Sequence, residues 1–169
     1  GVGVPIELMV DLCNRLDTDM WYCVPHMADD NFVTQAATVI LANLNSNLNL
    51  HIEYSNECWN GQFSQYDYVN AQGILKYGEE FDDYAAGWSW YGNRTTEVIA
   101  IFKGVWSAQV ERVTGVMATQ AASTFLGLRN LGCPLDPDAP CTDGVDALAI
   151  APYFSRGAAT EAEIELWDL

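Results

Sequence analysis

The strongest constraint on the fold of this chain is a regular alternation between two kinds of apolar pattern. Four short runs of mostly apolar residues are typical of buried strands, and they cover residues 20–25, 50–55, 112–120 and 145–154. Around them, apolar residues recur at the spacing of amphipathic helices, which predicts helices over residues 5–17, 30–44, 65–77, 93–109, 123–131 and 158–169. Strands that alternate with helices favour an α/β fold, in which helical crossovers connect the strands of a parallel sheet.

The length and the composition predict a single globular domain that covers residues 1–169. Half of the residues are hydrophobic and 18% are charged, which gives enough apolar material for a core and too little charge for disorder. Acidic residues outnumber basic ones by 23 to 7, and the formal net charge is -16. Such a surface repels a phosphate backbone and argues against nucleic acid as a partner, whereas a neutral polysaccharide is not repelled. No stretch of the sequence reaches the roughly 20 apolar residues of a membrane span.

The sequence contains five cysteines, of which two flank the same loop and three lie elsewhere. Cys133 and Cys141 flank a loop rich in proline and aspartate that has no apolar anchor of its own, which favours a disulfide between them and an oxidising compartment outside the cell. Two unpaired loop thiols are the alternative. Cys13, Cys23 and Cys58 stand in apolar or motif contexts and are predicted to be free, small, buried side chains. The spacing of the cysteines and histidines does not support a metal site.

Polar and aromatic side chains gather directly after the predicted strands. His26 follows the first strand, Asn56 and Glu57 follow the second, Gln120 follows the third, and Tyr153 lies at the end of the fourth. Parallel α/β folds place their ligand sites at these carboxyl ends of the strands. We therefore expect the side chains to share one cleft.

Glu57 is the strongest candidate for a catalytic residue in this cleft. Asn56 beside it can bind a sugar hydroxyl, and Trp59 offers a flat apolar face to a sugar ring. A carboxylic acid next to aromatic surface can be kept protonated by desolvation, as a general acid requires. The structural alternative is that Glu57 is an ordinary loop carboxylate and that Asn56 caps a helix.

The segment around this pair resembles a known enzyme family. Residues 51–60, His-Ile-Glu-Tyr-Ser-Asn-Glu-Cys-Trp-Asn, are similar to the fourth barrel strand of clan A glycoside hydrolases. Residues 21–30 and 147–154 resemble the third and sixth strands of secreted, cellulase-like members, so that residues 112–120 would form the fifth strand. The resemblance implies a fold of the TIM (β/α)8-barrel type and activity on a β-linked polysaccharide or oligosaccharide, without a metal or cofactor.

The same resemblance implies roles for individual residues. It makes Glu57 the general acid/base and places Asn56 against the sugar hydroxyl next to the anomeric carbon. His26 and Tyr153 would line the cleft from the third and sixth barrel strands. A capped loop histidine at position 26 and a packing residue at position 153 are the alternatives.

Other residues near the predicted cleft have two interpretations each. Trp59, Trp88 and Trp90 are candidate sugar platforms, with packing in the core as the alternative for each. Asp29 and Asp30 fit helix caps better than catalysts, because they directly precede a predicted helix.

Asn93 begins the tripeptide Asn-Arg-Thr, which matches the N-glycosylation pattern. It also stands where a helix is predicted to begin, and the helix N-terminus is the interpretation that we favour. A eukaryotic secreted source would shift this preference towards a glycan.

The resemblance also predicts that the barrel is incomplete. Retaining enzymes need a second carboxylate about 5 Å from the acid/base as the nucleophile, and in clan A it ends the seventh strand. A barrel spends about 31 residues on each βα unit, so that 169 residues supply about five units. Glu161, Glu163 and Glu165 follow Tyr153 too closely for a crossover helix and are predicted to face solvent on a tail helix. We therefore expect the two edge strands to pair with the remaining barrel polypeptide or with a neighbouring subunit.

Two functions are compatible with these observations. The first is a retaining glycoside hydrolase that acts on a β-linked polysaccharide and is seen without the strand that carries its nucleophile. The second is a non-catalytic relative of the same fold that binds carbohydrate or builds an extracellular assembly. An unrelated α/β enzyme is the remaining alternative. A later strand that ends in Glu would distinguish the first function from the second.

Overall fold

The computed structural model describes residues 3–81, 83–121, 123–136 and 140–151. Its strands are β1 (Met20–Val24), β2 (Leu50–Tyr54), β3 (Val113–Ala118) and β4 (Ala147–Ala149). Its α-helices are α1 (Ile6–Leu16), α2 (Asp30–Asn43), α3 (Ser64–Tyr77), α4 (Asp83–Trp106) and α5 (Thr124–Gly132). Two short 3-10 helices, η1 (Ser107–Arg112) and η2 (Cys141–Gly144), precede β3 and β4.

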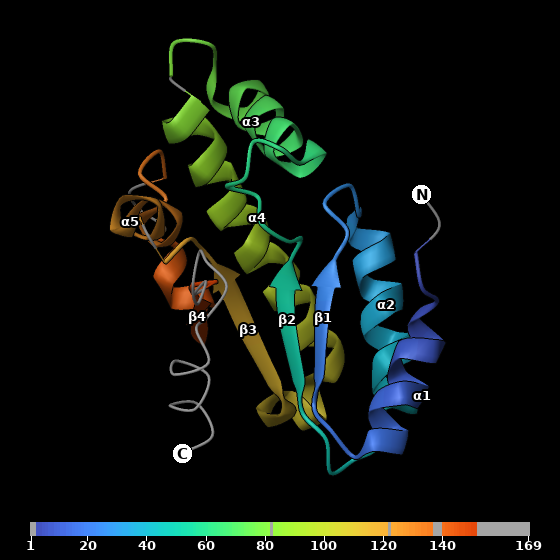
Figure 1. Ribbon diagram of the computed structural model, residues 1–169. Helices are drawn as coiled ribbons and strands as arrows, with labels where there is room; N and C mark the ends of the chain where they lie inside the picture. Colours follow the sequence, from blue (N-terminus) through green and yellow to red (C-terminus); the bar gives the residue numbers. More distant parts are fainter. Residues whose placement is uncertain (1–2, 82, 122, 137–139, 152–169) are drawn as a thin grey trace, which may run out of the picture.

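The four strands form one parallel sheet in the order β1-β2-β3-β4. Strands that follow one another in the chain are also neighbours in the sheet, and Figure 1 shows the arrows of β1, β2 and β3 pointing the same way. Parallel neighbours need a crossover between them, and α2, the α3–α4 pair and α5 supply these crossovers. The predicted α/β class with a parallel sheet is therefore confirmed.

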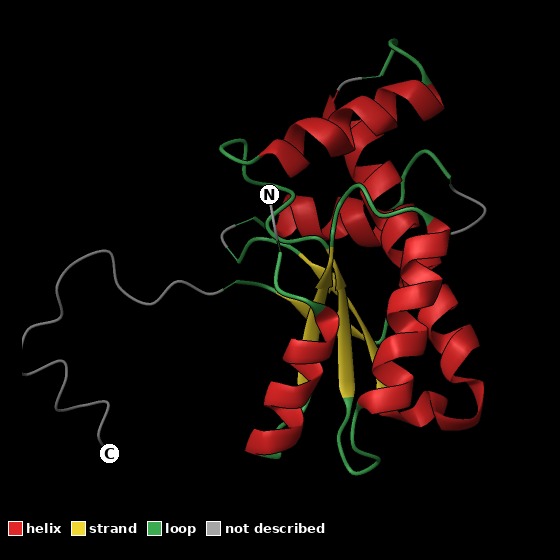
Figure 2. Cartoon of the chain, turned by 90° about the vertical axis from the view of Figure 1, so that its right-hand side faces the viewer, coloured by secondary structure: helices red, strands yellow, loops and turns green. Residues whose placement is uncertain are grey.

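The core lies on one face of this sheet. Along β1, the side chains of Met20, Tyr22 and Val24 are buried, whereas Trp21 and Cys23 between them are exposed. Helix α4 passes behind the strands in Figure 1, and the side view in Figure 2 shows the long helices stacked beside the layer of strands. Among the described helices, none has both the length and the apolar character that crossing a membrane requires.

Helix α4 begins ten residues before the predicted start at position 93. Asn93 therefore lies inside a helix, and the prediction that it stands at a helix N-terminus is wrong. Its side-chain Nδ2 donates hydrogen bonds to the carbonyl of Ser89 at 3.0 Å and to the hydroxyl of Tyr77 at 2.8 Å. A glycan would be attached to this same nitrogen, so the geometry argues against glycosylation of Asn93 in the folded chain.

Strand β4 is shorter than the predicted strand over residues 145–154. Ala151, with a φ of 42°, turns the chain out of the extended conformation soon after β4 ends. Tyr153 lies outside the described residues, and so does the predicted tail helix with Glu161, Glu163 and Glu165.

The predicted disulfide between Cys133 and Cys141 is present, with a Cα–Cα distance of 5.7 Å. Both cysteines are buried, and a Cβ added to Gly92 of α4 would lie 2.4 Å from the Cys133 sulfur. The bond thus pins the loop after α5 against α4. Cys13, Cys23 and Cys58 are free, as predicted. Cys23 is exposed rather than buried, because it points to the uncovered face of the sheet.

Removal of this disulfide should destabilise the fold measurably. Replacing Cys133 and Cys141 together by serine is expected to lower the free energy of unfolding by about 2.5 kcal/mol, because a closed loop with a sequence separation of 8 loses its entropic constraint. Urea unfolding under non-reducing conditions measures the change. Cys13→Ser, which leaves the disulfide intact, is the control and should shift the midpoint much less. Equal midpoints for the double variant and the wild type would show that the bond contributes nothing to stability.

Candidate active site

Glu57 lies in the loop that follows the carboxyl end of β2, not in a helix. Ser55 and Glu57 both adopt left-handed backbone conformations, with φ values of 61° and 47°. A non-glycine residue in this region costs on the order of 1 kcal/mol, and such strain is concentrated at functional sites. The chain therefore turns sharply where the candidate acid is placed, and the surrounding contacts must hold that turn.

Asn60 holds the carboxylate of Glu57. Its backbone N–H donates to the carbonyl of Glu57 at 2.9 Å, and its side-chain Nδ2 donates to Glu57 Oε2 at 3.0 Å. These two bonds fix both the turn and the orientation of the acid. Asn60 was not predicted as a site residue. Its position three residues after Glu57, where a tight turn closes, is the sequence signal that could have identified it.

The rest of the loop presents Asn56 and anchors Trp59. Asn56 is exposed, and its carbonyl accepts a hydrogen bond from Gln65 Nε2 at 2.7 Å. The alternative that Asn56 caps a helix is wrong, because α3 begins only at Ser64. Trp59 is half-buried and packs against the core, so that only part of its ring is open to a sugar.

His26 lies at the same edge of the sheet as the Glu57 loop. It comes two residues after Val24, and Val24 is paired with Tyr54 at the end of β2. The Tyr54 hydroxyl donates to the carbonyl of His26 at 2.6 Å. The imidazole packs edge-on against Tyr68, with 5.2 Å between the ring centroids. The structure thus confirms that these residues follow neighbouring strand ends, as the sequence indicates.

Aromatic side chains form a wall behind these strand ends. Trp90 of α4 contacts Tyr54 at a centroid distance of 6.0 Å and Tyr68 of α3 at 5.8 Å. Burial raises the pKa of Tyr54 well above its usual value, which keeps its hydroxyl a neutral donor. Trp88 is only 1% exposed, so the interpretation of Trp88 as a sugar platform is wrong. Trp90 is half-buried in this wall.

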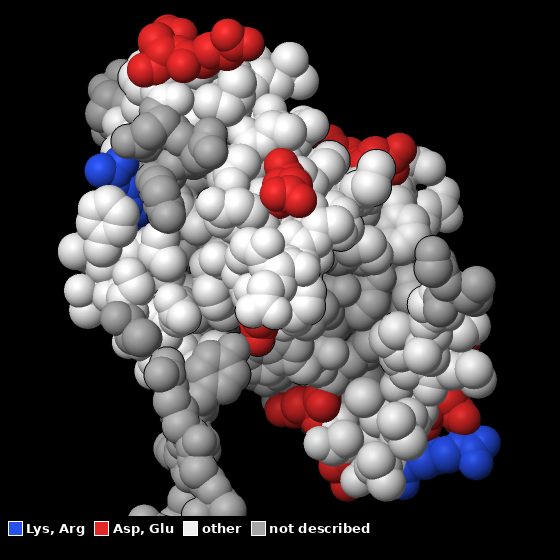
Figure 3. All heavy atoms as spheres, turned by 45° about the horizontal axis from the view of Figure 1, so that its top comes forward, with Lys and Arg blue, Asp and Glu red and all other residues white. Residues whose placement is uncertain are grey.

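Asp29 is a helix cap, as predicted, whereas Asp30 is the first residue of α2 and not its cap. Asp29 caps α2 by accepting a hydrogen bond from the N–H of Phe32 at 2.7 Å, and Asp30 forms an ion pair with Arg94 at 2.7 Å. Both border an open depression of about 550 Å³ in front of Trp90. On the face shown in Figure 3, acidic side chains form several separate groups and basic side chains are few.

A second carboxyl group is buried within the sheet. Glu53 of β2 is 7% exposed and lies opposite Cys23 of β1. Its Oε2 accepts a hydrogen bond from Trp21 Nε1 at 2.9 Å. Burial raises the pKa of Glu53, and the bond from Trp21 offsets part of this effect. The sequence signal that could have revealed it is a single acid within an otherwise apolar strand.

The raised pKa of Glu53 predicts how stability depends on pH. The folded state holds the Glu53 proton more tightly than the unfolded state, whose ordinary value is 4.5, so ionisation above that value destabilises the fold. Between about pH 5 and pH 8, Glu53→Gln should therefore gain stability relative to the wild type as the pH rises. Urea unfolding at both pH values measures this, with Glu79→Gln at an exposed position as the control. A difference in the free energy of unfolding between Glu53→Gln and the wild type that stays constant with pH would contradict the raised pKa of Glu53.

The structure therefore brings Glu57, Asn56 and His26 to one edge of the sheet, and Tyr153 lies outside the described residues. Within the described part of the chain, no group of three or more His, Cys, Asp or Glu side chains is arranged to hold a metal ion. Comparison with known proteins finds no matching family model, no matching curated protein and no matching solved structure, so the function has to be inferred from the side chains around Glu57.

Proposed function

We propose that the protein is a retaining glycoside hydrolase of the (β/α)8-barrel type that acts on a β-linked polysaccharide, with Glu57 as its general acid/base. The observation that carries this proposal is the placement of Glu57. It lies in a strained loop at the carboxyl end of an inner parallel strand, where Asn60 orients its carboxylate and Asn56 stands exposed beside it. Barrel enzymes build their active sites from such loops.

In the proposed reaction, Glu57 donates a proton to the glycosidic oxygen as the C–O bond breaks. A second carboxylate attacks the anomeric carbon, and Glu57 then removes a proton from the water that releases the sugar. This nucleophile has to lie about 5 Å from Glu57, and the proposal assigns it to further barrel polypeptide. Asn56 would bind a sugar hydroxyl, and Asn60 would keep the acid in position through both steps.

The uncovered face of the sheet supports the barrel part of the proposal. Trp21 is 50% exposed there, and Ala147 of β4, which points to the same face, is also exposed. Helix α1 also exposes three apolar side chains at four-residue spacing, Leu8, Leu12 and Leu16, and Val4 before the helix is exposed as well. Further barrel polypeptide or a neighbouring subunit that covered these surfaces would bury apolar area worth about 25 cal/mol per Å². The disulfide supports secretion, because such bonds persist in oxidising compartments.

A non-catalytic carbohydrate-binding protein is the second candidate. Asn56 and the half-buried Trp59 supply a hydrogen-bonding group and an apolar face, which suffice for binding a sugar. Glu53, the nearest acid in the sequence, is buried and hydrogen-bonded by Trp21, so that it is not available as a nucleophile.

Incubation of the full polypeptide with a panel of β-linked glucans, xylans and mannans tests the proposal. We expect new reducing ends from one of these polymers, with the β configuration retained in the first product seen by NMR. Binding to a polymer without release of reducing ends would favour the non-catalytic candidate. If the polypeptide neither binds nor cleaves any polymer of the panel, that result would contradict both candidate functions.

A further inference from the structure

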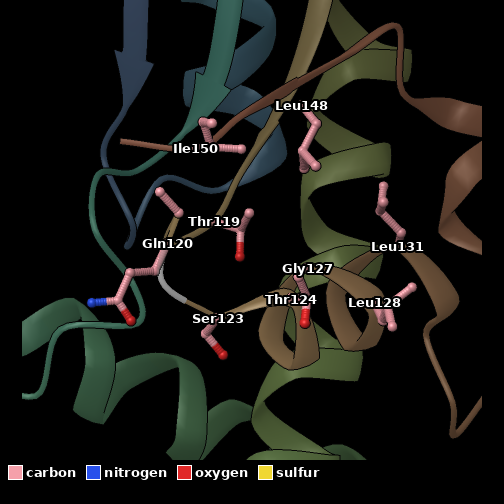
Figure 4. Close-up of a pocket in the computed structure, with 10 residues that line it drawn as sticks. Thr119, Gln120, Ser123, Thr124, Gly127, Leu128, Leu131, Leu148 and Ile150 are labelled. Atoms are coloured by element: carbon pink, nitrogen blue, oxygen red, sulfur yellow. The ribbon is translucent and has the colours of Figure 1, made fainter. Parts of the chain in front are cut away.

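Helix α5 and the ends of β3 and β4 border an open apolar pocket of about 420 Å³. Leu128 and Leu131 line it from α5, and Leu148 and Ile150 line it from β4 and the residues after it. Figure 4 shows these side chains around one space. Sites for small molecules usually measure roughly 300–1,000 Å³ and have mostly apolar walls with a few polar groups. The size and the lining of this pocket fit that description.

One polar group in the pocket has no partner. Thr119 is 3% exposed, and its Oγ1 makes no hydrogen bond within the described part of the chain. The Thr119 side chain faces α5, where a Cβ added to Gly127 would lie 3.5 Å from its methyl carbon and 3.8 Å from this oxygen. Buried hydroxyl groups are nearly always hydrogen-bonded, because leaving one unpaired is unfavourable. Rotation of the Thr119 side chain about χ1 would exchange its methyl group and its hydroxyl, and a polar atom of a ligand in the pocket would then satisfy this hydroxyl.

The arrangement of the lining restricts the chemistry of such a ligand. In Figure 4 the oxygens of Thr119, Ser123 and Thr124 gather towards one end of the pocket, and the leucines lie towards the other. The described lining contains no charged side chain, although the chain as a whole has a net charge of -16. The pocket is therefore suited to a neutral molecule with an apolar body and one hydrogen-bonding group.

We propose that this pocket binds a small neutral amphipathic molecule, a ring or short alkyl body that carries one hydroxyl group, with Thr119 Oγ1 as its polar contact. Gln120 lines this pocket and Glu57 does not, so the proposal does not depend on the role of Glu57 in the hydrolase proposal. Gly127 leaves the space beside Thr119 open, because any larger side chain at this position would enter the pocket.

Phenol and toluene test the proposal, because they have the same shape and differ in a hydroxyl and a methyl group. In titrations of the full chain followed by methyl NMR, both should give saturable shifts at Leu128, Leu131 and Ile150. Thr119→Val should weaken phenol binding about tenfold and leave toluene within about twofold, which corresponds to the loss of one hydrogen bond. Thr119→Ser should restore phenol binding. Equal weakening of both probes, or no saturable shift in the wild type, would overturn the proposal.

A pair of glycine variants in α5 checks the location. Gly127→Leu should fill the pocket and remove the binding of both probes. Gly132→Leu is the matched control, because a Cβ at position 132 meets no atom within 4 Å. Binding that persists in Gly127→Leu, in a chain whose NMR spectrum remains folded, would place the probes elsewhere and overturn the proposal.

Discussion

Replacing Glu57 by glutamine is expected to slow the hydrolysis of the polysaccharide by about 10²–10⁴-fold. Glutamine keeps the size of the side chain, and its carbonyl oxygen can still accept the hydrogen bond from Asn60 Nδ2. It has no acidic proton to give to the glycosidic oxygen. The rate of reducing-end release by the full polypeptide measures the effect. Glu79→Gln, at an exposed position after α3, is the control and should stay within about twofold of the wild type.

Binding of the sugar should survive this replacement, because the general acid acts mainly in the transition state. The dissociation constant for an oligosaccharide should change by less than about threefold, whereas the rate falls by orders of magnitude. A loss of binding that matched the loss of rate would instead indicate a damaged fold. A rate within about threefold of the wild type would contradict the role of Glu57 as general acid.

Gly73→Ala is expected to lower the free energy of unfolding by about 3 kcal/mol. A Cβ at this position would lie 2.3 Å from the carbonyl carbon of Ala86, 2.4 Å from its oxygen and 2.5 Å from the backbone nitrogen of Gly87. These are backbone atoms of α4 and cannot move aside as a side chain can. The two helices would have to separate, which would loosen the aromatic wall that α3 and α4 form behind Tyr54.

Gly104→Ala in α4 is the matched control for this variant. A Cβ at position 104 meets no atom within 4 Å, so the higher helix propensity of alanine should stabilise the chain by about 0.5–1 kcal/mol. The two replacements therefore have opposite expected signs in urea unfolding. A Gly73→Ala chain within about 1 kcal/mol of the wild type would mean that α3 and α4 are not packed as described.

Much of the fold could be predicted because its strands and most of its helices carry strong local patterns. Strands β1 and β2 and helices α2 and α3 begin and end within one or two residues of the predicted bounds. The first turns of α4 could not be predicted, because that segment contains Gly87 and Gly92, which are poor helix formers. Both glycines are required by close packing, against Asn70 and against the disulfide, and this packing is invisible in the local sequence.

The candidate site also contains features that the local sequence predicts and features that it does not. The positions of Glu57 and His26 at neighbouring strand ends follow from the alternation of strands and helices. The hydrogen bond from Tyr54 to the carbonyl of His26 and the burial of Trp88 depend on contacts between distant segments. No periodicity in the sequence could indicate them. The contact between Asn60 and Glu57 is different, because the two residues are only three positions apart and the spacing of a tight turn predicts that they meet.

The most direct test of Glu57 as the general acid compares two aryl β-glycosides that differ in the acidity of their leaving groups. The measured quantity is kcat/KM, which reports the first, bond-breaking step, for the wild type and for Glu57→Gln. A leaving group acidic enough to depart without a proton should be cleaved by the variant within about tenfold of the wild type, whereas a poor leaving group should lose about 10³-fold or more. The same fold loss for both substrates would contradict the account.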